Sequence, residues 1–507
     1  MSPTSSIADL LRRGSAQDVA LAAPGRPDCT YAALRAHVER TGRAVNRLGV
    51  GGNDAVAIVL PNGPEMASAF VGVAGAATAA PLNPGYRAEE FEFYLTDLEA
   101  KLLVVSEGVQ TPARDVAARL GLPVAEVVSD PAMPAGVFDL AGTTRADGAG
   151  AAGPTGPDDV ALVLHTSGTT SRPKIVPLSQ RNVCASAAHI ADSIALNAGD
   201  RCLNVMPLFH IHGLIAAVLA SLHAGATIYC TPGFSALRFF TWLDDARPTW
   251  YTAVPTMHQA ILERAERNVE TVRNARLRLI RSSSASLPAQ VMASLERTFG
   301  APVIEAYGMT EAAHQMASNP LPPRERTPGS VGVAAGPEIA IMDETGALLP
   351  PGATGEVVIR GPNVTGGYRN NPDANAAAFT DGWFRTGDQG VLDDDGYLRL
   401  TGRLKEIINR GGEKISPREV DEVLLDHPDI RQAVTFAVAH PKLGEDVAAA
   451  VVARDGARLT ERQIRAFAAT RLADFKVPRT IVLVDEIPKG PTGKLQRIGL
   501  AGKLGLE

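Results

Sequence analysis

The residues best suited to chemistry lie in a short loop that follows an apolar run. The run Val160–Leu164 leads into His165-Thr166-Ser167-Gly168-Thr169-Thr170-Ser171-Arg172-Pro173-Lys174. Small and hydroxyl-bearing residues after a strand let backbone N–H groups and hydroxyls approach phosphate oxygens, and Lys174 adds positive charge. The glycine and lysine spacing differs from that of the G-x-x-x-x-G-K-[ST] loop. The segment therefore predicts a phosphate site of another kind.

Further glycine-rich and charged segments follow this loop. In order, they are Ala306-Tyr307-Gly308-Met309-Thr310-Glu311, Thr386-Gly387-Asp388, Gly402-Arg403-Leu404-Lys405-Glu406, Asn409-Arg410-Gly411-Gly412-Glu413-Lys414 and Gly490-Pro491-Thr492-Gly493-Lys494. Together they resemble the adenylate-forming superfamily of acyl-CoA synthetases, peptide adenylation domains and firefly-type luciferases, and the resemblance covers almost the whole chain. It implies attack of a carboxylate on the α-phosphate of ATP and displacement of AMP by a thiol, chemistry that needs positive charge and hydrogen-bond donors.

The resemblance also implies which residues hold ATP. Tyr307 is expected to stack on adenine, Thr310 to reach the α-phosphate and Glu311 to bind Mg²⁺, a hard cation that prefers oxygen ligands. Asp388 would accept hydrogen bonds from the ribose, with Arg403 nearby. The expected ATP-binding residues are Thr166, Ser167, Gly168, Thr169, Thr170, Lys174, Ser284, Ala285, Ser286, Tyr307, Gly308, Asp388 and Arg403. The expected catalytic residues are Lys494, Glu311 and Thr310.

By the same resemblance, the chain has two domains that change their relative position during the reaction. Residues 1–402 would bind ATP and the acid, and residues 403–507 would form a small mobile domain with its hinge near Lys405. In one pose Lys494 would reach the reacting carboxylate. In the other, the CoA-binding residues Arg410, Gly411 and Gly412 would face the site. Acetylation of Lys494 by a lysine acetyltransferase would erase the charge that the reaction needs, and is an expected control.

The acyl pocket is expected to be small and polar. The stretches Met206–Leu214, Thr249–Thr256, Glu311–Pro320 and Asn409–Pro417 resemble oxalate–CoA ligases most closely. Many superfamily members carry a Gly-Gly-Ala-Pro segment where this chain has Arg281-Ser282-Ser283-Ser284-Ala285-Ser286-Leu287, and serines in place of glycines narrow the pocket. The expected acid-binding residues are His210, Ser283 and His314. Because a long aliphatic acid would leave such groups unpaired, at ~1–3 kcal/mol each, oxalate is the expected substrate.

Several alternatives stay open at this point. The acid could be malonate or another short or aromatic acid, and the acceptor could be a carrier-protein thiol loaded by a stand-alone adenylation enzyme. A nucleotide-binding sensor on the same fold is a third possibility, against which the intact Lys494 and Glu311 argue. Ser283 could instead stabilise a turn, and His212 could be either an acid ligand or a core histidine.

The elements that must position these residues alternate between helix and strand. Helical patterns over 34–48, 89–98 and 115–120 alternate with strand patterns over 55–60 and 101–105. This alternation predicts an α/β fold with layered, mostly parallel sheets in a large N-terminal domain. After Gly329, short apolar runs between Gly/Asp turns predict an antiparallel, β-barrel-like subdomain. Beyond Arg403 the pattern is that of a small α+β C-terminal domain, and residues 143–159 are expected to form an exposed connector.

Composition narrows the partners and the compartment. The 507 residues carry a net charge of −6, so no nucleic-acid partner is expected. The four cysteines form no CxxC pair, which favours a reducing compartment over a zinc site. No secretory signal is evident, and the weakly apolar segment 66–82 predicts a buried helix and strand rather than a membrane span. The expected protein is cytoplasmic, uses ATP, Mg²⁺ and CoA with a small carboxylic acid, and is a monomer or a homodimer.

Overall fold

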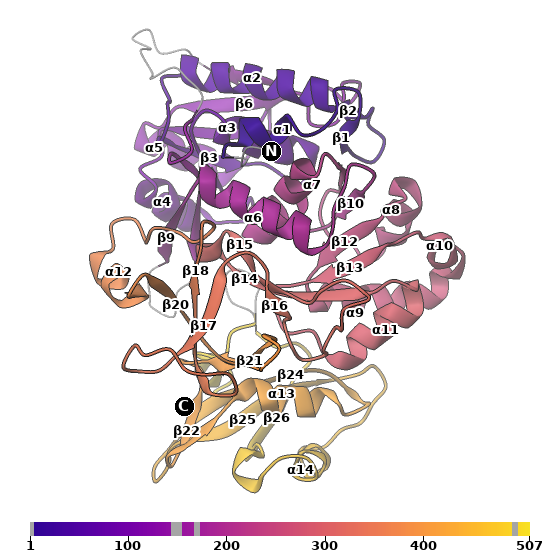
Figure 1. Ribbon diagram of the computed structural model, residues 1–507, viewed down its shortest axis with the longest axis vertical. Coiled ribbons are helices and arrows are strands. Elements are labelled where there is room, and N and C mark those ends of the chain that lie inside the picture. The colour runs from indigo at the N-terminus through magenta and orange to yellow at the C-terminus, as the bar shows by residue number, and fades with distance from the viewer. Residues whose placement is uncertain (1–4, 143–154, 167–172, 489–494, 507) are drawn as a thin grey trace. The chain divides into compact units, whose positions relative to one another are not determined.

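The chain folds into two compact units. The computed structural model describes residues 5–142, 155–166, 173–488 and 495–506. Of these described residues, the first unit comprises 5–142, 155–166, 174–338 and 359–379, and the second comprises 173, 339–358, 380–488 and 495–506. The expected domain boundary near Lys405 stays a prediction, because it concerns which segments move together rather than which pack together. Helices flank largely parallel sheets in the first unit, as the alternating sequence pattern predicts (Figure 1).

A seven-stranded sheet in the first unit carries the phosphate loop. Its strands, in spatial order, are β7 (Asp139–Gly142), β6 (Val124–Val128), β5 (Leu102–Ser106), β3 (Ala55–Val59), β4 (Thr78–Pro81), β8 (Val160–Thr166) and β9 (Lys174–Ser179). The five inner strands are parallel, and the outer two are antiparallel. Every residue of β3 is apolar and buried, as expected for a parallel strand that is covered on both faces.

Helices around this sheet confirm the helical patterns. They are α2 (Tyr31–Arg47), α3 (Pro64–Ala74), α4 (Ala88–Asp97), α5 (Pro112–Leu120) and α6 (Gln180–Ser193). The α2 helix begins earlier than predicted because the Thr30 side chain caps it by accepting from the backbone N–H of Ala33. Segment 66–82 is the buried α3–β4 pair that the sequence predicts. Among the helices of the described residues, none is long and apolar enough to cross a membrane.

The expected exposed connector before β8 is exposed only in part. Its residues 143–154 lie outside the described residues. Thr155 is buried, and its hydroxyl donates to the backbone carbonyl of Ala74 and accepts from the Gln180 side chain. The prediction of an exposed segment is therefore wrong at Thr155, because this polar side chain finds hydrogen-bond partners in the interior.

A nine-stranded sheet completes the first unit. Its strands, in order, are β16 (Val333–Ala334), β15 (His314–Ser318), β14 (Val303–Met309), β13 (Leu279–Ser282), β12 (Trp250–Ala253), β10 (Arg201–Asn204), β11 (Thr227–Cys230), β1 (Val19–Ala22) and β2 (Cys29–Thr30). The run from β14 to β1 is parallel. The carboxyl ends of parallel neighbours meet at one edge, so the segments after β10, β12, β13 and β14 come together there.

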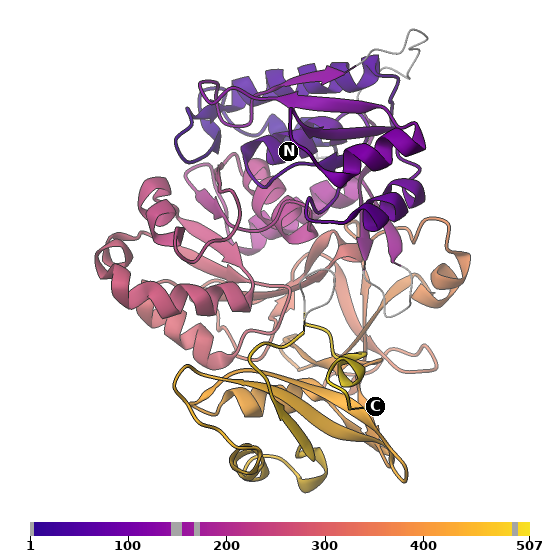
Figure 2. The same cartoon turned by 180° about the vertical axis from the view of Figure 1, so that it is seen from behind.

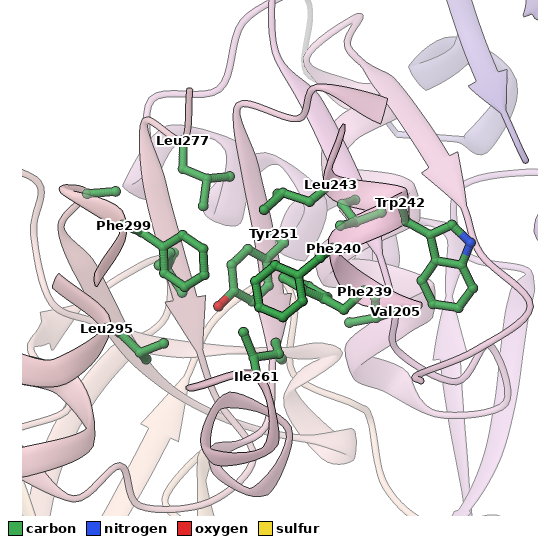
Figure 3. Packing of buried hydrophobic residues seen from close by; sticks show 14 of the residues in the cluster. Val205, Phe239, Phe240, Trp242, Leu243, Tyr251, Ile261, Leu277, Leu295 and Phe299 are labelled. Atoms are coloured by element: carbon green, nitrogen blue, oxygen red, sulfur yellow. The ribbon is translucent and has the colours of Figure 1, made fainter. Parts of the chain in front are cut away.

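An aromatic core holds this sheet against three helices. These helices are α8 (Phe239–Ala246), α9 (Pro255–Ala265) and α11 (Ala289–Phe299), and they lie together in both views (Figures 1 and 2). In Figure 3, the Tyr251 ring of β12 lies between aromatic rings of α8 and α11. Phe239 meets the Tyr251 ring edge-on, with ring centroids 5.3 Å apart. This packing fixes the strands whose carboxyl ends carry the candidate acid pocket.

The second unit contains two five-stranded sheets. The strand-rich texture after Gly329 is confirmed as one sheet of β17 (Glu338–Met342), β18 (Thr354–Arg360), β20 (Trp383–Leu392), β19 (Phe379–Thr380) and β21 (Leu398–Arg403). The other contains β23 (Glu413–Ile415), β22 (Ile408–Arg410), β25 (Gly444–Ala453), β24 (Ile430–His440) and β26 (Thr480–Leu483), with helices α13 (Pro417–Leu425) and α14 (Glu461–Ala469). These elements confirm the α+β pattern that the sequence predicts beyond Arg403.

Candidate functional site

The ends of the phosphate loop meet across a hairpin. Thr166 at the end of β8 pairs with Lys174 at the start of β9. The expected phosphate ligands between them, Ser167, Gly168, Thr169 and Thr170, lie outside the described residues. The antiparallel pairing therefore places Thr166 and Lys174, the first and last of the predicted phosphate-binding residues, opposite each other at the base of the loop.

A tyrosine that sequence reasoning missed joins two of the predicted nucleotide residues. The Lys174 ammonium lies over the Tyr368 ring, 4.3 Å from its centroid, and the Tyr368 hydroxyl donates to Glu311 Oε1 at 3.0 Å. Burial, reinforced by the Glu311 charge, raises the pKa of Tyr368, so its hydroxyl stays protonated and can donate. Its position directly after Gly366-Gly367 is the signal that could have drawn attention to it.

The Tyr368 backbone is itself held in place by α12 (Pro372–Ala378). Asn375 accepts from the backbone N–H of Tyr368 at 2.7 Å and donates to its carbonyl at 2.9 Å. Gly367 has a φ of +131°, which other residues rarely adopt, and a Cβ there would crowd Asn375. Nearby, the backbone N–H of Thr365 donates to the Glu311 carbonyl at 2.7 Å. The segment 365–375 thus fixes both the backbone and the carboxylate of Glu311.

The predicted adenine and α-phosphate residues lie on and after β14. Tyr307 is buried, Gly308 and Thr310 are half-buried, and Glu311 is 6% exposed in a short turn that leads into β15. Gly308 pairs with Gln315, and a Cβ at this position would overlap the carbonyl oxygen of His314. The hairpin as it is built therefore requires glycine at position 308, which explains this predicted residue structurally as well as functionally.

A histidine bridge joins the ends of three strands on the acid side. The ring nitrogens of His212 are hydrogen-bonded to Ser284 Oγ at 3.0 Å and to Thr252 Oγ1 at 2.6 Å. His212 also stacks on His314, with ring centroids 4.8 Å apart and an interplanar angle of 24°. Sequence reasoning placed His314 here but left His212 undecided. The structure connects His212 directly to Ser284, which was expected among the ATP-binding residues and here lies beside an acid-binding candidate, His314.

The backbone around this bridge is strained. Ser284, Ala313 and His314 have φ values of +71°, +47° and +92°. Such conformations are uncommon for residues other than glycine and concentrate at functional sites. Ser284 occupies a position where glycine would be the less strained choice. Its side chain is therefore held there at a conformational cost.

The remaining residues of the predicted site differ in their burial and in their contacts. Ser283 is buried and its hydroxyl donates to the backbone carbonyl of Ala306 at 2.8 Å, the stabilising contact that sequence left as an alternative to acid binding. His210 is half-buried with its ring 4.6 Å from that of Phe209. Ala285 and Ser286, which were expected to bind ATP, lie in the loop after β13, where Ala285 is exposed and Ser286 is half-buried.

The predicted ribose residues pair within the second unit. Asp388 faces Arg403 across the β20–β21 ladder, and Arg403 Nε lies 3.0 Å from Asp388 Oδ1. Asp388 is buried whereas the Arg403 side chain is 53% exposed. The expected hinge residue Lys405 is exposed in the turn that follows β21.

The predicted CoA-binding loop is a hairpin turn. Gly411 and Gly412 connect β22 to β23 with φ values of +61° and +100°. Both conformations favour glycine in a two-residue hairpin, so the turn requires the glycine pair independently of any ligand. Arg410 beside them donates from Nε to Asp446 at 2.6 Å.

The expected catalytic Lys494 lies outside the described residues, but the segment after it is firmly attached. Arg497 donates to Asp421 Oδ2 at 2.7 Å, to Glu406 Oε2 at 3.2 Å and to the backbone carbonyl of Thr435 at 3.2 Å. Glu406 adjoins the expected hinge. Arg497 therefore connects the chain after Lys494 with the chain after Lys405 inside one unit.

Comparison with known proteins identifies the family of the chain. Residues 12–369 match the AMP-binding enzyme family, and residues 419–494 match the AMP-binding enzyme C-terminal domain. The chain belongs to the AMP-binding enzyme family. An oxalate–CoA ligase from Arabidopsis thaliana is 49% identical, covering 94% of each chain. A sulfoacetate–CoA ligase from Cupriavidus necator is 36% identical, covering 93% of this chain and 92% of the relative.

The fold of this AMP-binding enzyme is shared with solved structures. ATP-bound MatB from Rhodopseudomonas palustris superimposes with a TM-score of 0.88 at 29% identity, covering 99% of both chains. The predicted adenylate-forming membership and the predicted α/β fold class are both confirmed. The roles of single residues stay predictions, and the following substitutions test three of them.

Ser284→Gly should separate stability from activity in this AMP-binding enzyme. Glycine removes ~1 kcal/mol of left-handed backbone strain but also loses the hydrogen bond to His212, so the thermal midpoint should change little. Loss of the hydroxyl should lower kcat/KM for the acid by about tenfold, the value of one good hydrogen bond. Ser284→Ala is the control, with the same loss of activity but a lower thermal midpoint, because it loses the hydrogen bond and keeps the strain. Unchanged kcat/KM in Ser284→Gly would show that the hydroxyl serves only the fold.

Tyr368→Phe should weaken the apparent affinity for Mg²⁺ without disturbing Lys174. The phenylalanine ring keeps the cation–π contact, but Glu311 loses the donor that orients it, so ATP–pyrophosphate exchange should need about tenfold more Mg²⁺. Tyr368→Leu removes both contacts and should raise the KM for ATP as well. Identical Mg²⁺ titrations for the wild type and Tyr368→Phe would refute this positioning role.

Arg497→Met should destabilise the second unit and impair adenylate formation. It leaves Asp421 buried without its cationic partner, which costs ~3–5 kcal/mol in urea unfolding. The exposed Arg454→Met is the matched control and should stay within ~0.5 kcal/mol of the wild type. Equal unfolding midpoints for the two variants would contradict an anchoring role for Arg497.

Proposed function

We propose that this protein is an ATP-dependent acid–CoA ligase that activates a small, doubly charged acid, with oxalate as the first candidate. The observation that carries the proposal is the strained cluster of Ser284, His212 and His314 beside the turn that bears Glu311. Buried polar groups of this density suit a short polar acid, because an alkyl chain would leave them without partners. The names of the oxalate and sulfoacetate ligases among its relatives support this choice of acid.

In the first half-reaction, a carboxylate oxygen attacks the α-phosphorus of ATP. The bond from that phosphorus to the bridging oxygen breaks, and pyrophosphate leaves. We assign Lys174 and the phosphate loop to the departing phosphates, and Thr310 to the α-phosphate. Because these hydrogen-bond donors and cations would already be in position, they would stabilise the charge that spreads in the transition state with little rearrangement of the site.

Glu311 suits the Mg²⁺ that the AMP-binding enzymes are expected to use. It is a single, nearly buried carboxylate whose orientation is fixed by Tyr368. Mg²⁺ commonly binds one or two protein carboxylates together with substrate phosphate oxygens. When bound, the ion neutralises phosphate charge. The contribution of this chain is to hold Glu311 where such an ion can reach it.

In the second half-reaction, the thiol sulfur of CoA attacks the acyl carbon. The bond from that carbon to the phosphate oxygen breaks, AMP leaves and the thiol proton is released. We propose that residues 403–507 rotate about Lys405 between the two half-reactions, first presenting Lys494 and then the Arg410-Gly411-Gly412 turn. The turn has no Cβ on its two glycines, which leaves room for a narrow pantetheine arm.

A panel of acids tests the activity. Oxalate, malonate, acetate, octanoate and 4-coumarate are compared for acid-dependent AMP release in the presence of CoA. We expect oxalate to give the highest kcat/KM and octanoate the lowest, because the short acid matches the polar pocket. Consumption of CoA by the purified protein supports the ligase over an enzyme that loads a carrier protein. The absence of AMP release with every short acid would refute the proposed function.

Lys494→Ala tests the assignment of the two half-reactions. Adenylate formation should fall by about 10²–10³-fold because one preorganised cation is lost. Attack of CoA on supplied oxalyl-adenylate should be largely unaffected. Equal loss in both half-reactions would contradict the assignment of Lys494 to the first pose alone.

A further inference from the structure

A buried arginine lies behind the acid-side residues. Arg281 is in β13, its side chain is fully buried, and it is among the largest fully buried side chains of the protein. In the described part of the chain, Arg281 forms no ion pair with a carboxylate, and its Nε has no hydrogen-bond partner. Burial lowers the pKa of Arg281 to about 9, so it remains charged at neutral pH. An uncompensated charge in the interior is costly and calls for a function.

Hydrogen bonds connect Arg281 to the histidine bridge. Its guanidinium donates to Gln315 Oε1 at 2.9 Å and to Thr252 Oγ1 at 3.5 Å. Thr252 is in turn bonded to His212, and His212 to Ser284. The charge of Arg281 is thus two hydrogen bonds away from His212, on the opposite side from Ser284.

The hydrogen bonds from Arg281 to Ser284 can all run in one direction. Arginine has donors only, so Thr252 Oγ1 accepts from it, and in the arrangement that we assign the Thr252 hydroxyl donates to His212 Nε2. His212 then carries its proton on Nδ1 and donates it to Ser284 Oγ. The Ser284 hydroxyl proton is left to donate to the acid. In this arrangement Arg281 orients Thr252, His212 and Ser284 so that a hydrogen-bond donor faces the acid.

We propose that Arg281 is a specificity-determining positioning residue that makes the acid site select acids carrying two negative charges. The inference rests on the proposed function and deepens it. When one carboxylate of such an acid reacts with ATP, the other stays ionised and compensates the buried guanidinium. An acid with a neutral second group leaves that charge uncompensated, and such mismatches are rejected most strongly in a water-poor interior.

Oxalate and oxamate form the decisive pair of substrates. They have nearly the same shape, but oxamate has a neutral amide in place of the second carboxylate. The preference is the ratio of kcat/KM for oxalate to that for oxamate, measured by AMP release. The wild type should prefer oxalate, and Arg281→Met should reduce this preference by about tenfold or more, mainly through the KM for oxalate.

Gln315→Glu neutralises the arginine without removing it. The new carboxylate would lie at the position of Gln315 Oε1, 2.9 Å from the guanidinium, and should reduce the preference as Arg281→Met does. Gln315→Met is the matched control: it removes the same hydrogen bond but adds no charge, so the preference should persist. Because Arg281 stays in place in both Gln315 variants, the comparison holds even if Arg281→Met fails to fold.

Three results would overturn the inference. They are equal use of oxalate and oxamate by the wild type, an unchanged preference in Gln315→Glu, or an equal loss of preference in Gln315→Glu and Gln315→Met. Failure of the proposed function gives a different result, since oxalate would then release no AMP. If another diacid is activated instead, the same kcat/KM ratio is measured with that diacid and its half-amide. This ratio tests the role of Arg281 separately from the identity of the acid.

Discussion

The candidate acid pocket of this protein depends on the bridge that His212 makes between neighbouring strand ends. One ring nitrogen meets Thr252 in β12, the other meets Ser284 after β13, and the ring stacks on His314 at the start of β15. Parallel strands bring these segments to one edge, but the bridge fixes their side chains relative to one another. Because Ser284 and His314 are strained, their conformations persist only while surrounding contacts hold them.

On the nucleotide side, too, polar groups are fixed by buried partners. Tyr368 orients Glu311 through its hydroxyl and lies under Lys174 through its ring. One aromatic side chain thereby sets the distance between an anionic and a cationic group. Arg281 is hydrogen-bonded but faces no carboxylate in the described part of the chain, which lowers stability unless a ligand supplies the opposite charge. At both sites the protein gives up some folding stability to keep hydrogen-bond donors in position for a ligand.

Much of the fold follows from local sequence patterns. The apolar run before the phosphate loop, the alternation of helix and strand, and the strand-rich segment after Gly329 all appear as predicted, because hydrophobic periodicity sets which face is buried. The predicted connector before β8 is wrong at Thr155, which is buried with polar partners. Periodicity could not show this, since a small polar residue carries no signal of what lies across from it.

The sequence by itself determined the class of chemistry, because the phosphate loop, the Thr310–Glu311 pair and the glycine-flanked Lys494 are local motifs whose order is characteristic. Only the tertiary structure decided which groups His212, Tyr368 and Arg281 contact. Their partners Thr252, Glu311 and Gln315 are 40, 57 and 34 positions away in the chain. Such contacts depend on strand order and register, which no local pattern encodes.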